Sequence, residues 1–318
     1  MLDLIAYLFV IGLSRLLAAL PLGAALALGR LLGSLGYHII PIRRRVVLGN
    51  LRHVFGASRS DSEIRRIALE AYRELMMNLI EMLRASVADP RRYEPHAELE
   101  GLDRLRAAEE AGTPFIICSP HAGNFDLLAY TTAAGGVAPH VFMKPLKSPR
   151  FNRLLVGTRE RLGLRLLLKG SGSLREMIGL IKRGESVGLL PDQNARSRGV
   201  TVDFLGRPAS TFQGPAALHL LTNAQIVVAL IERLAADPCR HHGRFIFLPP
   251  APRSGDRKAD VRRVTQQYCD VMSEAILRNP GQYFWFHRRW GKGIGSAPLS
   301  ERVTAAAVTS DARPDRRQ

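Results

Sequence analysis

The chain has 318 residues, of which 46% are hydrophobic and 23% are charged. These proportions are ordinary for a globular protein, and they exclude a wholly disordered chain, a collagen and a polytopic membrane protein. Its 45 basic and 28 acidic residues give a formal net charge of +17. Such an excess is expected to attract an anionic partner: a membrane surface, a nucleic acid, or an acidic protein or substrate.

The first 42 residues are the most apolar part of the chain, in three uncharged runs that Arg15 and Arg30 interrupt. No run reaches the roughly 18 apolar residues of a clean transmembrane helix, and Asp3 disfavours a secretory signal. One interpretation is a helical membrane anchor, bent at Pro21 and followed by basic residues 43–45 that suit anionic head groups. The alternative is a buried pair of helices. We favour the anchor.

A long amphipathic helix is predicted over residues 60–86, where apolar residues recur at helical spacing and Ser60 or Asp61 can cap the start with Glu63 nearby. From Gly101 onward, short apolar strands alternate with helices. Strands are predicted at residues 115–119, 140–143, 164–168, 186–190, 201–204, 226–232 and 244–248. The accompanying helices are predicted at residues 102–111, from about 124, and at 149–162, 173–183, 213–221 and 260–277.

This alternation predicts an α/β fold with a mostly parallel central sheet flanked by helices, preceded by the N-terminal membrane-associating segment. We expect residues 43–295 to form one domain and residues 296–318 to be a disordered tail. The three cysteines, Cys118, Cys239 and Cys269, lie far apart and form no CxxC pair. Their spacing disfavours a disulfide framework or a thiolate zinc site, so a reducing compartment or a cytosol-facing domain is expected.

His121 follows the predicted strand 115–119, and Asp126 lies five residues further along. Ligands of open α/β sheets bind at the carboxyl ends of strands, so this histidine lies where chemistry is expected. Side chains five apart on a helix point about 140° from each other, so the pair can meet only if the chain bends at residues 122–124. A histidine held by a carboxylate suits a general base. A helix cap beside a packed histidine is an equal alternative, and Cys118 is interpreted as a buried strand thiol.

Three further segments carry polar groups near predicted strand or helix ends. Arg159 and Arg161 suit a phosphate, although a solvated helix face is the commoner explanation. Residues 170–173 join a strand to a helix but lack the third glycine of a dinucleotide fingerprint, so a helix-capping turn is favoured. Asp192 and Gln193 follow a strand, where an ordinary turn is the alternative.

Six blocks taken together resemble the lipid A late (lauroyl/myristoyl) acyltransferase family, which includes the mycobacterial phosphatidylinositol-mannoside acyltransferases. They are HAGNFD at 121–126, RERLG at 159–163, LLPDQ at 189–193, VDFLG at 202–206 with Thr211 and Gly214, YFWFHRRW at 283–290, and a membrane-proximal start in residues 21–23 and 43–51. The resemblance covers residues 15–292. It implies a membrane-associated acyltransferase domain over residues 43–295.

The resemblance assigns the catalytic histidine to His121 and its acidic partner to Asp126. Many lipid A members carry glutamate at the second position, so Asp126 is nearer to the phospholipid and glycolipid branches. Substrate-binding residues are expected at Asn124, Lys144, Arg159, Arg161, Asp192, Gln193 and Thr211. Of the two arginines we expect Arg161 to enter the site, because Gly163 can end the helix there.

The implied reaction moves a fatty acyl chain from acyl-CoA or acyl carrier protein to a hydroxyl group of a membrane lipid. Candidate acceptors are a lipid A precursor, a lysophospholipid and a phosphatidylinositol mannoside. His121 removes the hydroxyl proton, and backbone donors or an arginine stabilise the oxyanion. We expect no metal, no prosthetic group and no nucleic-acid partner, and location at the cytoplasmic face of the cell inner (plasma) membrane.

Three other functions stay open at this point. A nucleic-acid-binding protein would suit the charge, but no known binding motif is present. A non-catalytic lipid-binding protein would leave the His–Asp pair unexplained. An acyl-thioester hydrolase would use water in place of the lipid hydroxyl.

Overall fold

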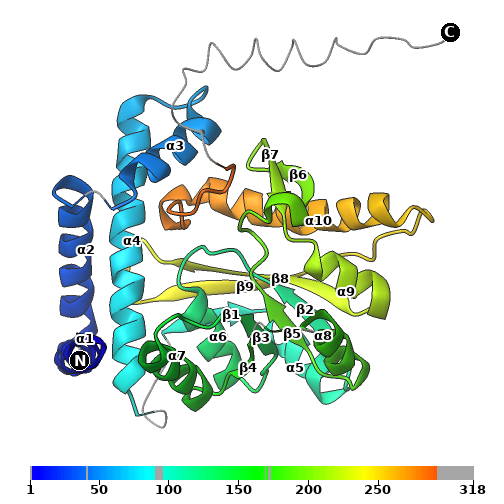
Figure 1. The fold of residues 1–318 in the computed structure, drawn as a ribbon, viewed down its shortest axis with the longest axis horizontal. Helices are drawn as coiled ribbons and strands as arrows, with labels where there is room; N and C mark the ends of the chain where they lie inside the picture. Colours follow the sequence, from blue (N-terminus) through cyan, green and yellow to red (C-terminus); the bar gives the residue numbers. More distant parts are fainter. Residues whose placement is uncertain (1, 41, 90–95, 169, 171–172, 292–318) are drawn as a thin grey trace.

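The computed structural model describes residues 2–40, 42–89, 96–168, 170 and 173–291. A seven-stranded sheet has the order β1-β9-β8-β2-β5-β3-β4 (Figure 1). Its strands are β1 (Ala97–Glu100), β2 (Phe115–Cys118), β3 (His140–Met143), β4 (Arg165–Leu168), β5 (Val187–Leu189), β8 (Gln225–Arg233) and β9 (His241–Phe247). The five strands from β8 to β4 are parallel, while β9 runs antiparallel to β8 and β1 runs parallel to β9. The predicted α/β fold with a mostly parallel sheet is therefore confirmed.

Helices cover both faces of the sheet. They are α5 (Leu102–Glu110), α6 (Phe125–Ala134), α7 (Pro149–Arg161), α8 (Ser173–Lys182), α9 (Gly214–Thr222) and α10 (Arg257–Arg278). In β2, Phe115 and Ile117 pack with α5 and α6, while Ile116 and Cys118 pack with α8, α9 and α10. All four positions of β2 are buried, which is why this strand reads as an unbroken apolar run.

A separate hairpin lies outside the main sheet, formed by β6 (Val200–Phe204) and β7 (Arg207–Thr211). The sequence predicted the first of these strands but not the second, nor β1. Strand β1 has the sequence AELE with every second residue exposed, which is typical of an edge strand but too short to give a clear pattern. Helix α3 (Arg44–Phe55) was also not predicted.

The long helix α4 (Asp61–Val87) connects the N-terminal helices to the sheet domain (Figure 1). Ser60 and Glu63 form a capping box at its start, which confirms the predicted cap. Helices α1 (Leu2–Ala19) and α2 (Leu22–His38) meet at Pro21 and pack along α4. A Cβ atom at Gly33 would lie 2.5 Å from the Cα of Arg73, so this glycine allows α2 and α4 to approach closely.

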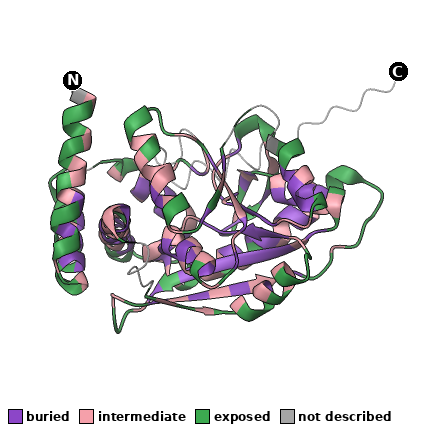
Figure 2. Ribbon diagram, turned by 90° about the horizontal axis from the view of Figure 1, so that it is seen from below, coloured by how far each residue is buried: buried purple, intermediate pink, exposed green. Residues whose placement is uncertain are grey.

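The outward faces of α1 and α2 are apolar and exposed, as the green surface of the N-terminal helix in Figure 2 illustrates. Large apolar side chains on this surface are Leu4, Ile5, Leu8, Phe9, Leu16, Leu31, Leu32 and Leu35. Within the described residues, none of the helices combines the length and the apolar character needed to cross a membrane. The predicted tail at 296–318 and two residues of the 170–173 turn lie outside the described residues.

Candidate active site

The His121 loop, which we define as residues 119–124, connects the carboxyl end of β2 to α6. Strand β5 lies beside β2 and runs parallel to it, with Cys118 paired to Leu189. Two neighbouring strands therefore end at the same edge of the sheet, and the residues that follow them come together. This arrangement brings His121 next to Asp192, 71 positions later in the chain.

His121 is held by Asp192 through two contacts. The imidazole Nδ1 lies 2.6 Å from Oδ1 of Asp192, and the backbone N–H of His121 donates to Oδ2 at 3.0 Å. With the Nδ1 proton donated to the carboxylate, Nε2 is unprotonated and can accept a hydrogen bond or a proton. The Nε2 of Gln193 lies 3.2 Å from that atom.

Burial and charge shift the pKa values of His121 and Asp192 in opposite directions. Burial disfavours the imidazolium, but the charge and hydrogen bond of Asp192, with a smaller contribution from Asp126, raise the pKa of His121 above its ordinary value. Burial likewise opposes the carboxylate of Asp192, whose side chain is only 1% exposed. The positive charge and the hydrogen bonds of His121 nevertheless hold the pKa of Asp192 below its ordinary value.

Asp126, the acidic partner expected from the sequence, forms an ion pair with Arg159 instead. Its Oδ1 accepts from Nη2 of Arg159 at 2.7 Å and from Nε at 3.1 Å. The bend that was required is present, since Gly123 has a φ of +59°. Asn124 then caps α6 directly, so Asp126 lies in the first turn and faces α7 rather than Nδ1 of His121. The carboxylate that accepts from Nδ1 of His121 is that of Asp192.

The two arginines of α7 have different partners. Arg161 donates from Nη2 to the carbonyl oxygen of Ser86 at 2.7 Å, near the carboxyl end of α4. Residues two apart on a helix do not share a face, so Arg159 and Arg161 point to different sides. Gly163, with a φ of +90°, does end the helix region, but it does not turn Arg161 toward His121.

The remaining predicted binding residues differ in their exposure and in their hydrogen-bond partners. Lys144 is exposed and directly follows β3, whose carboxyl end lies at the same edge of the sheet. Thr211 is fully buried, and its hydroxyl accepts a hydrogen bond from Arg289. The Asn124 side chain also forms a hydrogen bond within the protein, because its Oδ1 accepts from the backbone N–H of Leu127.

The segment after α10, residues 279–291, completes the site. In the sequence, only the family resemblance indicated a role for it. The backbone N–H of Phe284 donates to the carbonyl oxygen of His121 at 2.9 Å. Burial and the nearby charge of Asp192 raise the pKa of Tyr283 well above its ordinary value, so its phenol stays neutral. Arg289 is almost fully buried and donates to the carbonyl oxygen of Ser210. Its positive charge contributes to the lowered pKa of Asp192.

A cavity of about 300 Å³ adjoins His121. Apolar side chains of α4, of α6 and of the segment after α10 form most of its wall: Ala71, Leu75, Leu79, Met82, Phe125, Phe284 and Phe286. The polar residues that also line it are Glu74, Asn78, His121, Asn124, Asp126, Gln193, Gln282 and Tyr283. A basic nitrogen at the wall of an apolar cavity suits the transfer of a group that carries a long hydrocarbon chain.

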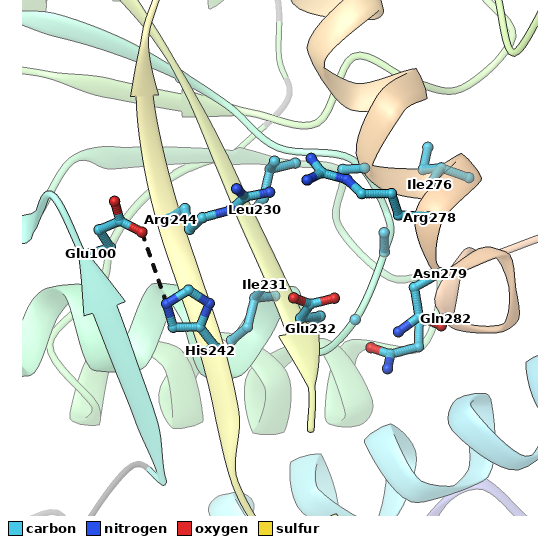
Figure 3. Close-up of a pocket in the computed structure, with 13 residues that line it drawn as sticks. Glu100, Leu230, Ile231, Glu232, His242, Arg244, Ile276, Arg278, Asn279 and Gln282 are labelled. Atoms are coloured by element: carbon cyan, nitrogen blue, oxygen red, sulfur yellow. Dashed lines mark ion pairs between the residues drawn. The ribbon is translucent and has the colours of Figure 1, made fainter. Parts of the chain in front are cut away.

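A second cavity, of about 230 Å³, lies on the other side of the His121 loop (Figure 3). Arg244 enters it from β9 and Arg278 from α10, while Glu100 and Glu232 supply two carboxylates. Its opposite charges are equal in number, and the carbonyl end of α10 adjoins it, so it has no net attraction for an anion. We therefore place the chemistry in the first cavity. Among the described residues, no group of three or more His, Cys, Asp or Glu side chains is placed to hold a metal ion.

Residues 1–292 match the sequence profile of the family described as bacterial lipid A biosynthesis acyltransferase. The chain is 26% identical over 296 residues to the lipid A biosynthesis palmitoleoyltransferase of Escherichia coli (strain K12), an alignment covering 92% of this chain and 93% of that protein. The lipid A biosynthesis lauroyltransferase of the same strain is 25% identical over 284 residues, covering 88% and 89%. The phosphatidylinositol mannoside acyltransferase of Mycobacterium tuberculosis (strain CDC 1551 / Oshkosh) is 25% identical over 193 residues, covering 60% and 58%. The resemblance inferred from the motifs is confirmed.

Proposed function

This chain belongs to the family of bacterial lipid A biosynthesis acyltransferases, and we propose on that premise that it transfers a fatty acyl group from a thioester donor to a hydroxyl group of a lipid or glycolipid. The chain is an acyltransferase, as its named relatives are. The single observation that carries the proposed chemistry is the His121–Asp192 pair beside an apolar cavity.

His121 is the general base in this proposal. The acceptor hydroxyl gives its proton to Nε2 while its oxygen bonds to the thioester carbonyl carbon. Asp192 fixes the Nδ1–H tautomer and stabilises the imidazolium that forms. The tetrahedral intermediate then collapses, the carbon–sulfur bond breaks, and the thiolate takes the proton from His121. An ester and a thiol are the products, and His121 is neutral again.

Gln193 and Arg159 have separate roles. The amide of Gln193 lies 3.2 Å from Nε2 of His121, which is the place where the acceptor hydroxyl must bind. We assign it to orienting that oxygen. The guanidinium of Arg159 is mostly buried, and Asp126, which lines the cavity, fixes it. We assign to it the stabilisation of the negative charge that develops on the thioester oxygen.

The apolar cavity is proposed to hold the acyl chain. Each methylene group removed from water contributes about 0.8 kcal/mol, so a fatty chain supplies substantial binding energy that is independent of the head group. The donor is proposed to be acyl-CoA or acyl carrier protein, because both are anionic and the chain has a formal net charge of +17. The acceptor is proposed to be a lipid A precursor, a lysophospholipid or a phosphatidylinositol mannoside, since relatives of two of these classes match the chain.

We place the enzyme at the cytoplasmic face of the cell inner (plasma) membrane. The exposed apolar faces of α1 and α2 support this, because such surfaces bind the interface between lipid chains and head groups. The basic cluster at residues 43–45 contributes less than the sequence indicated. Arg43 donates to the carbonyl oxygen of Phe286, and Arg44 stacks on the ring of Tyr37 at 4.5 Å. Arg45 is exposed, so it stays available to anionic head groups.

Detergent-solubilised full-length protein with labelled acyl-CoA or labelled acyl carrier protein tests the proposal, each with and without one of the three candidate lipids. We expect a labelled lipid ester to form with at least one donor and acceptor combination. Release of free fatty acid at the same rate with and without every lipid would indicate a hydrolase instead. An Asn223→Asp variant, altered at an exposed residue after α9, serves as the matched protein control.

A further inference from the structure

A buried cluster of charges lies behind the His121 loop, and the reaction proposed above does not use it. Arg233 ends β8, and its side chain is 3% exposed. Its Nε donates to Glu74 at 3.0 Å, and its Nη2 donates to Glu81 at 2.6 Å and to Oδ1 of Asn78 at 2.8 Å. The three α4 residues are spaced four and three apart, so they lie on one face of that helix.

The cluster holds the His121 loop at two points. Nδ2 of Asn78 donates to the carbonyl oxygen of Gly123 at 2.9 Å. Nδ2 of Asn124 donates to Oε2 of Glu81 at 2.7 Å. The same Oε2 accepts from Arg233, so one carboxylate oxygen connects the arginine to the loop.

Asn124 connects the charge cluster to the start of α6. Its Oδ1 accepts from the backbone N–H of Leu127 at 3.0 Å and caps α6, while its Nδ2 is held by Glu81. Both ends of the amide are therefore fixed, and so is the angle at which α6 begins. The first turn of α6 carries Asp126, which holds Arg159.

A third contact fixes the loop from the side of the segment after α10. The backbone N–H of Gly123 donates to the carbonyl oxygen of Gln282 at 2.9 Å. The side chain of Gln282 in turn accepts from the backbone N–H of Arg233 and donates to its carbonyl oxygen. Gly123 is thus attached to the last residue of β8 through Gln282, and Asn124 is attached to it through Glu81.

Stability alone does not account for so many buried charges. Burial opposes the charged state of Arg233, and only the two carboxylates keep its pKa above the ordinary value. Burial also raises the pKa of Glu74. Replacing a buried ion cluster by well-packed apolar residues is often neutral or stabilising, so retaining one costs stability that a conformational role can justify.

We infer that the chain of contacts from Arg233 through Glu81 to Asn124 is a positioning device for acyl transfer, which sets where His121 and the Asp126–Arg159 pair stand relative to the substrate. Asn124 also lines the cavity beside His121, and we assign it as a positioning residue because both ends of its amide are bound within the protein. This inference rests on the proposed function. A misplacement of catalytic groups by about 1 Å costs on the order of 10²-fold in rate.

The Asn124→Asp variant separates the two tasks of this residue. Aspartate caps a helix as well as asparagine does, so the bond to the N–H of Leu127 is kept. It cannot donate to Glu81, and it places a second carboxylate against that residue. We expect kcat to fall on the order of 10²-fold, with a much smaller change in the KM for the donor. The buried pair of carboxylates should also lower the melting temperature.

The Asn124→Ser variant separates the lost hydrogen bond from the added charge. Serine also caps a helix, but its shorter side chain cannot bridge to Glu81, and it adds no carboxylate. We expect its kcat also to fall on the order of 10²-fold, by the same positional argument. The matched control is Asn223→Asp, a substitution at an exposed residue after α9, which should leave kcat unchanged. A wild-type kcat in Asn124→Asp or in Asn124→Ser overturns the inference.

Hydrogen–deuterium exchange provides a readout that does not need activity. Amides of residues 119–128 should exchange faster in Asn124→Asp and in Asn124→Ser than in the wild type. Unchanged exchange in Asn124→Asp overturns the inference. If the wild-type protein transfers no acyl group, the proposed function fails, and the exchange rates still decide whether the cluster positions the loop.

Discussion

The Nδ1 atom of His121 lies 2.6 Å from Oδ1 of Asp192, whereas Asp126, five residues after the histidine, is bound to Arg159. The site thus has two carboxylates with different partners. Asp192 orients the imidazole, and Asp126 orients the guanidinium. A variant of each carboxylate should therefore change a different property of the reaction.

Asp192→Asn should reduce kcat by about 10²–10⁴-fold, because it removes the charge that stabilises the imidazolium and favours the wrong tautomer. It should also move the acid limb of the pH profile. Activity requires neutral His121, and Asp192 raises the pKa of that imidazole, so the wild-type limb lies above the ordinary histidine value of 6.5. Without the charge, burial dominates and the limb should shift to lower pH. The dependence of kcat/KM on pH measures this, and an acid limb that stays in place contradicts the assignment.

Asp126→Asn is the comparison for that experiment. Its charge makes only a smaller contribution to the pKa of His121, so its acid limb should move less than that of Asp192→Asn. Its loss of kcat should instead resemble that of Arg159→Lys. An equal shift of the acid limb in both carboxylate variants would show that the two carboxylates act on His121 in the same way.

Arg159→Lys should lose most of the activity, while Arg161→Lys should be mild. Two nitrogens of Arg159 bind Oδ1 of Asp126, a fork that a lysine ammonium does not reproduce. Arg161 contacts a carbonyl oxygen near the end of α4, where lysine also forms a favourable contact. Steady-state kinetics on both variants test this order, and the reverse order would place Arg161 at the substrate.

Both His121 and Asp192 were candidate site residues from the sequence, but the sequence paired His121 with Asp126, whereas its Nδ1 lies beside Asp192. Polar residues at two strand ends, His121 and Asp192, were recognisable from the alternation of strands and helices. What a single sequence does not specify is that β5 lies beside β2, since strand order arises from packing of the whole sheet. Local spacing therefore favoured Asp126. The choice between Arg159 and Arg161 stays a prediction, because it depends on the rotation of α7, which tertiary contacts set.

Gly123→Ala should destabilise the protein strongly. Gly123 has a φ of +59°, and a Cβ atom there would lie 2.1 Å from the carbonyl oxygen of Ile231. Gly112 provides the control, since its φ is +62° but no atom lies within 4 Å of the added Cβ. We expect a loss of about 1–2 kcal/mol for Gly112→Ala and about 3 kcal/mol or more for Gly123→Ala. Denaturant unfolding of both variants measures the difference, and equal losses contradict the close packing of the loop on β8.

Exchanging exposed apolar residues of α1 should weaken membrane binding without unfolding the protein. Phe9 is 68% exposed and Leu16 is 64% exposed, so a Phe9→Ser/Leu16→Ser variant removes little packing. Leu221→Ser/Leu277→Ser is the matched control on α9 and α10. Cosedimentation with anionic phospholipid vesicles should fall for the first variant only, because interfacial binding grows with buried apolar area. Equal binding of both variants and the wild type argues against the N-terminal helices as the membrane contact.

His121→Ala is the most direct test of the catalytic account. The variant should keep the fold, measured by circular dichroism and melting temperature, because the side chain lies at the wall of a cavity. With labelled acyl donor and the acceptor lipid that the wild-type enzyme uses, we predict that formation of the labelled lipid ester falls by at least about 10²-fold. Ester formation by folded His121→Ala at the wild-type rate would contradict the claim that this histidine removes the acceptor proton.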